Sequence, residues 1–99
     1  MEQESKVEEK KDKFKVIWKR KIDKQIAKMP VKIQDKFHDL VSDIRKSGPV
    51  QRGWANFSDL GKDLYHCHLG YSWVACWTAK KDTVIVEVYY VGSRESAPY

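Results

Sequence analysis

Two histidines, His66 and His68, are the residues whose type and spacing could support chemistry. Side chains alternate between the two faces of a strand, so a His-x-His pair on a strand presents both rings on the same face. The pKa of an unperturbed imidazole is about 6.5, so both the neutral form, which accepts a proton, and the charged form, which donates one, are present near neutral pH. The pattern therefore fits general acid–base catalysis.

Two other interpretations of the pair stay open on spacing alone. The rings could simply be exposed on a strand without any role, and this is about as compatible with the spacing as catalysis. They could also bind zinc together with a cysteine. Zinc is disfavoured because Cys67 would project to the opposite face and no fourth ligand is evident in the sequence. We therefore expect neither a metal nor another cofactor.

Length and composition limit the classes of protein to consider. A chain of 99 residues has room for one domain with one modest core. No apolar run reaches the roughly 20 residues needed to cross a bilayer, and no signal peptide is evident, so we expect a cytoplasmic chain without membrane contact. The two cysteines are then expected to be reduced. A net charge of +5 suits a polyanionic partner, either a nucleic acid or an acidic protein.

Charge and hydrophobic spacing divide the chain into an extension and a domain. Residues 1–13 are almost entirely charged or polar and cannot bury a face, so we expect a disordered extension. The domain should span residues 14–99. Phe14, Val16 and Trp18 alternate with Lys15, Ile17 and Lys19, which predicts a first strand with one buried face.

Two helices should follow the first strand. Ile22, Ile26 and Met29 recur at helical spacing, and Pro30 suits the first turn of a second helix better than the interior of the first. An apolar stripe runs along the second helix, and a glycine-proline pair ends it at 48–49. The stripe consists of Ile33, Phe37, Leu40, Val41 and Ile44. Lysines 32, 36 and 46 lie away from that stripe and are most simply a solvated face, although they could also meet ribosomal RNA through non-specific phosphate contacts.

The second half of the chain favours strands because it concentrates aromatic residues. We expect three, at about 64–69, 72–79 and 83–91, joined by short turns. The predicted fold is α+β: an N-terminal strand, a two-helix hairpin and a three-stranded antiparallel meander. The helices should cover one face of the sheet and leave the other free for a partner or substrate. We expect packing in the core or on the sheet, in preference to stacking on RNA bases, for Trp54, Trp73 and Trp77.

This order of elements resembles the RelE/ParE toxin family over residues 14–99. Short motifs at Leu60-Gly61, Gly70-Tyr71 and in the segment around His66 contribute to the resemblance. Its most specific piece is the last strand running into Val91-Gly92-Ser93-Arg94-Glu95, followed by Tyr99, which is similar to the end of RelE-like mRNA interferases. The resemblance implies a toxin of a type II toxin–antitoxin system.

The resemblance also implies where the site lies. The family's catalytic positions, on the concave face of the sheet, fall on His66, His68, Arg94 and Tyr99 in this sequence. Lys62 and Arg94 are the positions expected to contact RNA. The sequence departs from the family pattern at Ser72, where an arginine is usual, and in carrying histidines where lysine or arginine is usual.

The activity implied is metal-independent endoribonuclease cleavage of mRNA on the ribosome by attack of the ribose 2′-hydroxyl. The implied partners are a cognate antitoxin, the ribosome and mRNA. Three alternatives stay open: a ParE-like inhibitor of gyrase, an inactive relative that acts as a binding module, and a general basic RNA-binding domain. The Arg94 and Tyr99 ending and the paired histidines argue against the gyrase inhibitor, and Ser72 makes the inactive relative credible.

Overall fold

The structure is a computed structural model and describes residues 12–99. The expected extension at 1–13 therefore lies almost wholly outside the described residues. The elements follow one another as β2 (Lys15–Trp18), α2 (Arg20–Lys28), α3 (Val31–Ser47), β3 (Ser58–Gly61), β4 (Leu64–Gly70), β5 (Trp73–Ala79), β6 (Ile85–Ser93) and the 3-10 turn η1 (Arg94–Ser96). Within this part of the chain, no helix is long and apolar enough to cross a membrane.

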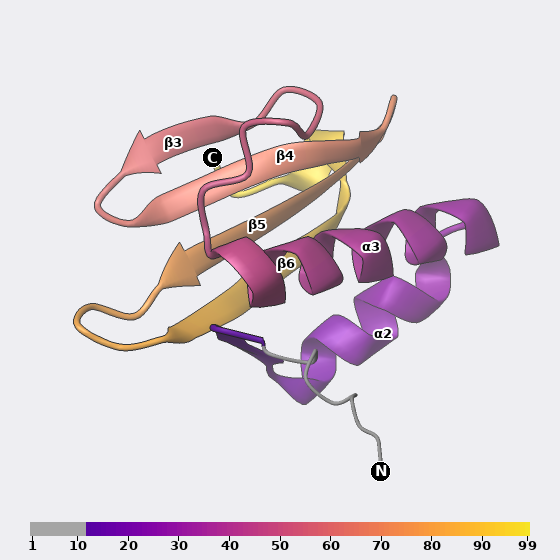
Figure 1. Cartoon of the computed structure of the whole chain (residues 1–99). Coiled ribbons are helices and arrows are strands. Elements are labelled where there is room, and N and C mark those ends of the chain that lie inside the picture. Colours follow the sequence, from indigo (N-terminus) through magenta and orange to yellow (C-terminus); the bar gives the residue numbers. More distant parts are fainter. Residues whose placement is uncertain (1–11) are drawn as a thin grey trace, which may run out of the picture.

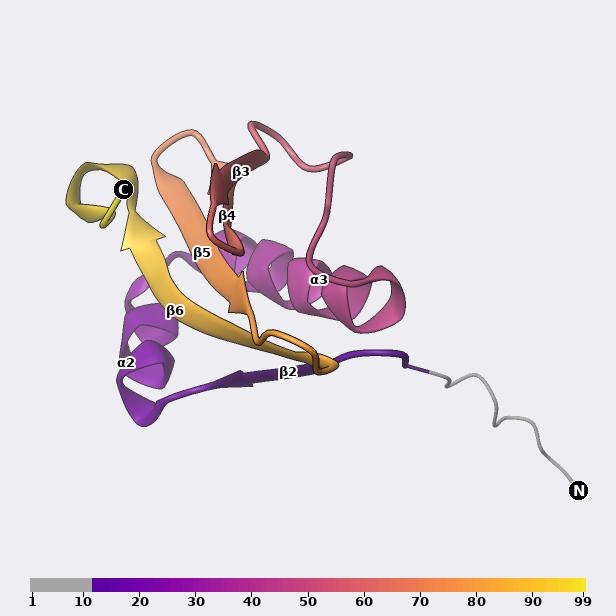
Figure 2. The same cartoon turned by 90° about the vertical axis from the view of Figure 1, so that its left-hand side faces the viewer.

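The five strands form one sheet in the order β2-β6-β5-β4-β3. Strands β3 to β6 are successive antiparallel neighbours, whereas β2 pairs with β6 in parallel, with Val16 opposite Val86. Helices α2 and α3 lie against one face of this sheet (Figures 1 and 2). The predicted α+β fold, with its helical hairpin on one face, is confirmed.

The core lies between the two helices and the sheet. The predicted stripe on α3 is buried at Phe37, Leu40, Val41 and Ile44, and Ile33 packs beside it. From the sheet, Trp77 is fully buried, and its indole N–H donates to the Pro49 carbonyl at 2.9 Å. The expected packing role of Trp77 is thus confirmed, and the indole also anchors the chain just after α3.

Gly48 ends α3, as the sequence predicted, and its environment explains the residue type. Its φ of 97° is a conformation that other residues rarely adopt. A Cβ at this position would lie 2.9 Å from ring atoms of Phe14. Glycine therefore allows both the turn after the helix and the close approach of the first strand's leading residue.

Strand β3 was not predicted from the sequence. The meander has four strands, because Ser58–Gly61 pairs with β4 in antiparallel register, with Ser58 opposite His66. The segment is polar, exposed and poor in β-favouring residues, so its strand conformation depends on pairing with β4. The expectation of three strands in the second half is therefore wrong, because it missed the edge strand β3.

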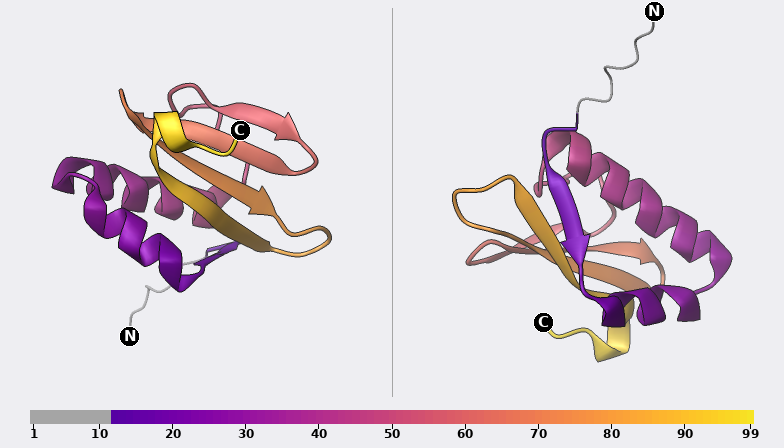
Figure 3. Two further views of the ribbon diagram at one scale, coloured as in Figure 1. Left: turned by 180° about the vertical axis from the view of Figure 1, so that it is seen from behind. Right: turned by 90° about the horizontal axis from the view of Figure 1, so that it is seen from below.

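The sheet face opposite the helices is not left open, so the expectation that this face is free for a partner or substrate is wrong. The C-terminal segment turns back after β6 and lies across this face (Figure 3, left). Val74 and Cys76, on the strand side away from the helical core, are fully buried. The centre of the expected open face is therefore covered, and only parts of it reach solvent.

Candidate functional site

A row of three side chains crosses the sheet on the face away from the helices. His66 on β4 is the register partner of Cys76 on β5, and Cys76 is the partner of Tyr90 on β6. His68 follows two positions later, and its ring centre is 6.0 Å from that of His66. The alternation expected for a His-x-His pair on a strand thus brings both rings to one region of one face.

His66 is buried, and the last residue of the chain helps to bury it. Its ring centre lies 4.2 Å from that of Tyr99, and the residue is 7% exposed. Burial lowers the pKa of His66 below 6.5, and the nearby His68 lowers that pKa further. His66 is therefore neutral at pH 7, in the state that accepts a proton.

One ring nitrogen of His66 lacks a partner. Nδ1 is buried and makes no hydrogen bond within the described residues. An unpaired buried polar atom costs free energy, so native proteins retain few of them, and each calls for an explanation. A pair of close, differently buried titratable rings is the kind of arrangement that functional sites use to separate an acid from a base.

Arg94 begins the turn that returns the chain over the sheet. Its backbone N–H donates to the Ser72 carbonyl at 2.8 Å, and its guanidinium carbon lies 5.3 Å from the centre of the Tyr71 ring. The side chain is exposed and free to meet a phosphate. Ser72, which stands where the family pattern has an arginine, contributes here through its backbone alone.

Tyr99 and Arg94 influence each other electrostatically. Burial raises the pKa of Tyr99, and the positive charge of Arg94 opposes that rise. The Tyr99 hydroxyl is therefore protonated at neutral pH. Four of the five predicted site residues, His66, His68, Arg94 and Tyr99, are thereby linked through ring contacts and charge.

Lys62 is not brought to this cluster. It lies at the exposed tip of the β3–β4 hairpin, with a φ of 54°. Arg94 is beside the β4–β5 turn, at the other end of β4, and strand length places about 20 Å between those two ends. Contact of Lys62 with RNA stays a prediction, one that requires a ligand long enough to follow the strand.

The two cysteines are buried on opposite faces. Cys67 belongs to the core beneath the helices, whereas Cys76 lies outside it, where its sulfur accepts a hydrogen bond from the Tyr89 hydroxyl. Burial raises the pKa of both thiols to about 12, so both are protonated and unreactive. Residues 12–99 contain no group of three or more histidine, cysteine or acidic residues placed to hold a metal ion.

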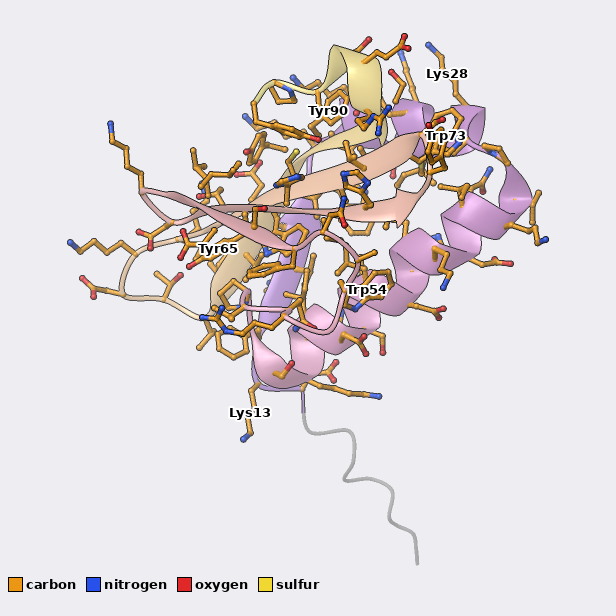
Figure 4. The ribbon with its side chains drawn as sticks, turned by 90° about the horizontal axis from the view of Figure 1, so that it is seen from above. Lys13, Lys28, Trp54, Tyr65, Trp73 and Tyr90 are labelled. Atoms are coloured by element: carbon orange, nitrogen blue, oxygen red, sulfur yellow. The ribbon has the colours of Figure 1, made fainter. Side chains whose placement is uncertain are left out.

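A cavity next to the histidine pair was not predicted. It has a volume of about 580 Å³ and lies between α3, the loop before β3 and the β4–β5 turn, lined by Lys36, Trp54, His68 and Tyr71 among others. Figure 4 shows Trp54 beside α3, away from Tyr90 and the C-terminal turn. The sequence feature that could have indicated this cavity is the presence of two aromatic residues, Trp54 and Tyr71, outside the predicted helices and strands.

The fold is that of the RelE-like toxins. The structure superposes on the archaeal RelE–RelB complex from Pyrococcus horikoshii with a TM-score of 0.68, at 12% identity, covering 86% of this chain and 99% of the matched chain. The isolated Escherichia coli RelE toxin superposes with a TM-score of 0.67 at 15% identity, covering 86% of this chain and 88% of the matched chain.

The YoeB–YefM complex from Staphylococcus aureus is a third similar structure. Its TM-score is 0.63 at 10% identity, covering 82% of this chain and 97% of the matched chain. No protein-family model matches the sequence, and no curated protein sequence matches it either. At these identities the likeness concerns the fold, and the chemistry has to be argued from the site residues themselves.

Proposed function

We propose that the chain is the toxin of a toxin–antitoxin pair and that it cleaves mRNA on the ribosome without a metal. The observation that carries the proposal is the His66 and His68 pair, with its unequal burial, beside Tyr99 on a RelE-like fold. Similar folds occur in a toxin crystallised alone and in toxin–antitoxin complexes. A basic chain of net charge +5 suits both RNA and an acidic antitoxin.

The proposed reaction uses the two rings in different protonation states. Neutral His66 accepts the proton of the ribose 2′-hydroxyl, and the 2′-oxygen attacks the phosphorus. The bond from phosphorus to the 5′-oxygen breaks, and protonated His68 donates a proton to that leaving oxygen. The products are a 2′,3′-cyclic phosphate and a 5′-hydroxyl, so protons and bonds balance.

Arg94 supplies the fixed positive charge in this scheme. Negative charge grows on the non-bridging phosphate oxygens during the attack, and a guanidinium can hold two of them at once. The exposed position of Arg94 leaves its planar group available to a phosphate. A loss of this charge is expected to slow cleavage more than it weakens binding.

Tyr99 occupies the surface of His66 that a substrate must reach. Its ring is about half exposed and contacts His66 from a segment with no regular structure after η1. An RNA base can replace the imidazole as the partner of this ring and stack on it, because single-stranded RNA is commonly held on aromatic side chains. Displacement of Tyr99 would uncover the base catalyst as the substrate binds.

The decisive experiment is to induce the chain in cells and map mRNA 5′ ends. Cuts confined to translated reading frames, and lost in a His66→Ala/His68→Ala double variant, are the expected result. Purified protein should leave 2′,3′-cyclic phosphate ends on programmed ribosomes. Growth arrest without cuts, accompanied by inhibited supercoiling by gyrase, would replace this proposal with the gyrase inhibitor.

A binding module without catalysis is the second candidate, and two observations favour it. Ser72 lacks the side chain usual at its position, and His66 is largely covered. Tight binding to ribosomes with no cleavage at any pH between about 5 and 8 would support this candidate over the enzyme.

A further inference from the structure

The cavity beside the histidine pair has the features of a ligand site. Its volume of about 580 Å³ lies within the range of about 300–1,000 Å³ typical of pockets for small ligands. Two aromatic rings, Trp54 and Tyr71, and one cation, Lys36, contribute to its lining. Tyr71 is 85% exposed, so a large aromatic surface at the rim has no partner except the Arg94 guanidinium.

The wall formed by the loop before β3 is fixed in place by hydrogen bonds. The Trp54 indole N–H donates to Asp43 on α3 at 2.9 Å, and the Ala55 carbonyl accepts from the His68 backbone N–H at 2.8 Å. Gln51 further holds the start of the loop by donating to the Gly48 carbonyl at 2.8 Å. The cavity is therefore preformed, which reduces the entropy lost on binding.

The charges around the cavity favour an anionic ligand with a flat ring. The Lys36 ammonium lies 5.9 Å from the centre of the Trp54 ring, and Arg94 lies over Tyr71 at the other side. His68 lines the cavity and is also 6.0 Å from His66. His68 is therefore the residue shared by the cavity lining and the pair that carries the proposed chemistry.

We propose that this pocket binds one nucleobase of single-stranded RNA, adjacent to the phosphate held between His66, His68 and Arg94. The identity of the ligand as RNA rests on the proposed function, whereas the pocket itself rests on Trp54, Tyr71 and Lys36. The base stacks on aromatic surface, and Lys36 meets the neighbouring phosphate. This assigns Trp54 and Lys36, expected from the sequence to be a packing residue and a solvated lysine, to substrate positioning.

The test uses a 2′-O-methyl RNA trinucleotide, which lacks the attacking hydroxyl and cannot be cleaved by the proposed reaction. Its affinity for the purified chain should fall at least about fivefold in Tyr71→Ala and stay close to the parental value in Tyr71→Phe, which keeps the ring. Lys36→Gln should weaken binding, whereas Lys32→Gln, an exposed lysine on the same helix outside the pocket, should not.

Nuclear magnetic resonance separates the pocket from the catalytic proposal. The trinucleotide should shift the indole N–H signal of Trp54 and leave that of Trp18, which is bonded to Asp23 elsewhere, unchanged. Shifts at His66 without a shift at Trp54, together with parental affinity in Tyr71→Ala and Lys36→Gln, would overturn the pocket and leave the proposed function standing. A Trp54 shift with the trinucleotide, combined with no cleavage of unmodified mRNA on programmed ribosomes, would support the pocket and remove the catalysis.

Discussion

The ring of Tyr99 lies 4.2 Å from the ring of His66, although the two residues are far apart in the sequence. This contact brings the end of the chain onto the strand face that carries both histidines (Figure 3). It helps to bury His66, and burial is the main cause of the lowered pKa of that imidazole. A tyrosine that the resemblance placed in the site therefore also contributes to the burial that lowers the pKa of its neighbour.

Removing the Tyr99 ring should raise the pKa of His66. Tyr99→Ala exposes the imidazole, which relieves the cost of charging it and moves its pKa up toward the ordinary value of about 6.5. Titration of the histidine ring signals by nuclear magnetic resonance measures the shift, and Tyr71→Ala is the control for loss of an exposed tyrosine. Identical His66 titrations in Tyr99→Ala and the parent would contradict the role given to this contact.

Folding stability should fall as the pH drops below about 6.5. The pKa of His66 is lower in the folded chain than in the unfolded one, so the unfolded state takes up a proton first as the pH falls. The free energy of unfolding therefore decreases as the pH drops from the pKa of the unfolded state to that of the folded state. Replacement by asparagine removes this contribution. The urea midpoint of His66→Asn should therefore depend less on acidic pH than that of the parent.

The matched control for acid stability is His38→Asn, a change of an exposed histidine on α3. Its midpoint should follow the parental dependence on pH. Equal slopes for the parent and His66→Asn between about pH 5 and 7.5 would show that the folded chain does not hold His66 neutral.

Cleavage should follow a bell-shaped pH profile if the proposed reaction is correct. The acidic limb reports protonation of the base and the alkaline limb reports loss of the acid's proton, with both limbs between about pH 5 and 8. His66→Ala and His68→Ala should each slow single-turnover cleavage on programmed ribosomes by about 100-fold or more. A flat profile together with near-parental rates in both variants would leave Arg94 and Tyr99 to carry any chemistry.

Arg94→Lys should separate binding from cleavage. The fold and ribosome affinity should persist because the side chain is exposed and a positive charge is kept. Cleavage should fall by about 100-fold, since an ammonium cannot reproduce the two-point contact with a phosphate. Arg52→Lys, at another exposed arginine, is the control. Parental cleavage in Arg94→Lys would identify Arg94 as a bystander.

An acidic antitoxin should bind the chain tightly. The outer strands β2 and β3 each have one edge without a strand partner in the described sheet, so a segment can add a strand or lay a helix beside them. Calorimetry with the product of the neighbouring gene should show saturable binding that weakens as salt is added. No association at either low or moderate salt would remove the expected partner.

Local sequence determined the helices, most of the strands and the shared face of the histidines. Helical spacing placed the stripe on α3, and Gly48 marked its end, because periodicity and backbone restrictions act within a few residues. Alternation placed His66 and His68 together and Cys67 opposite them for the same reason.

Only the tertiary structure decided what depends on residues that are distant in sequence. Strand β3 has little strand preference of its own and is held by pairing with β4. The burial of His66 depends on where the C-terminal segment turns, and the pocket depends on Lys36, Trp54 and Tyr71 meeting from three separate segments. Such contacts are selected by packing of the whole chain, which no local pattern encodes.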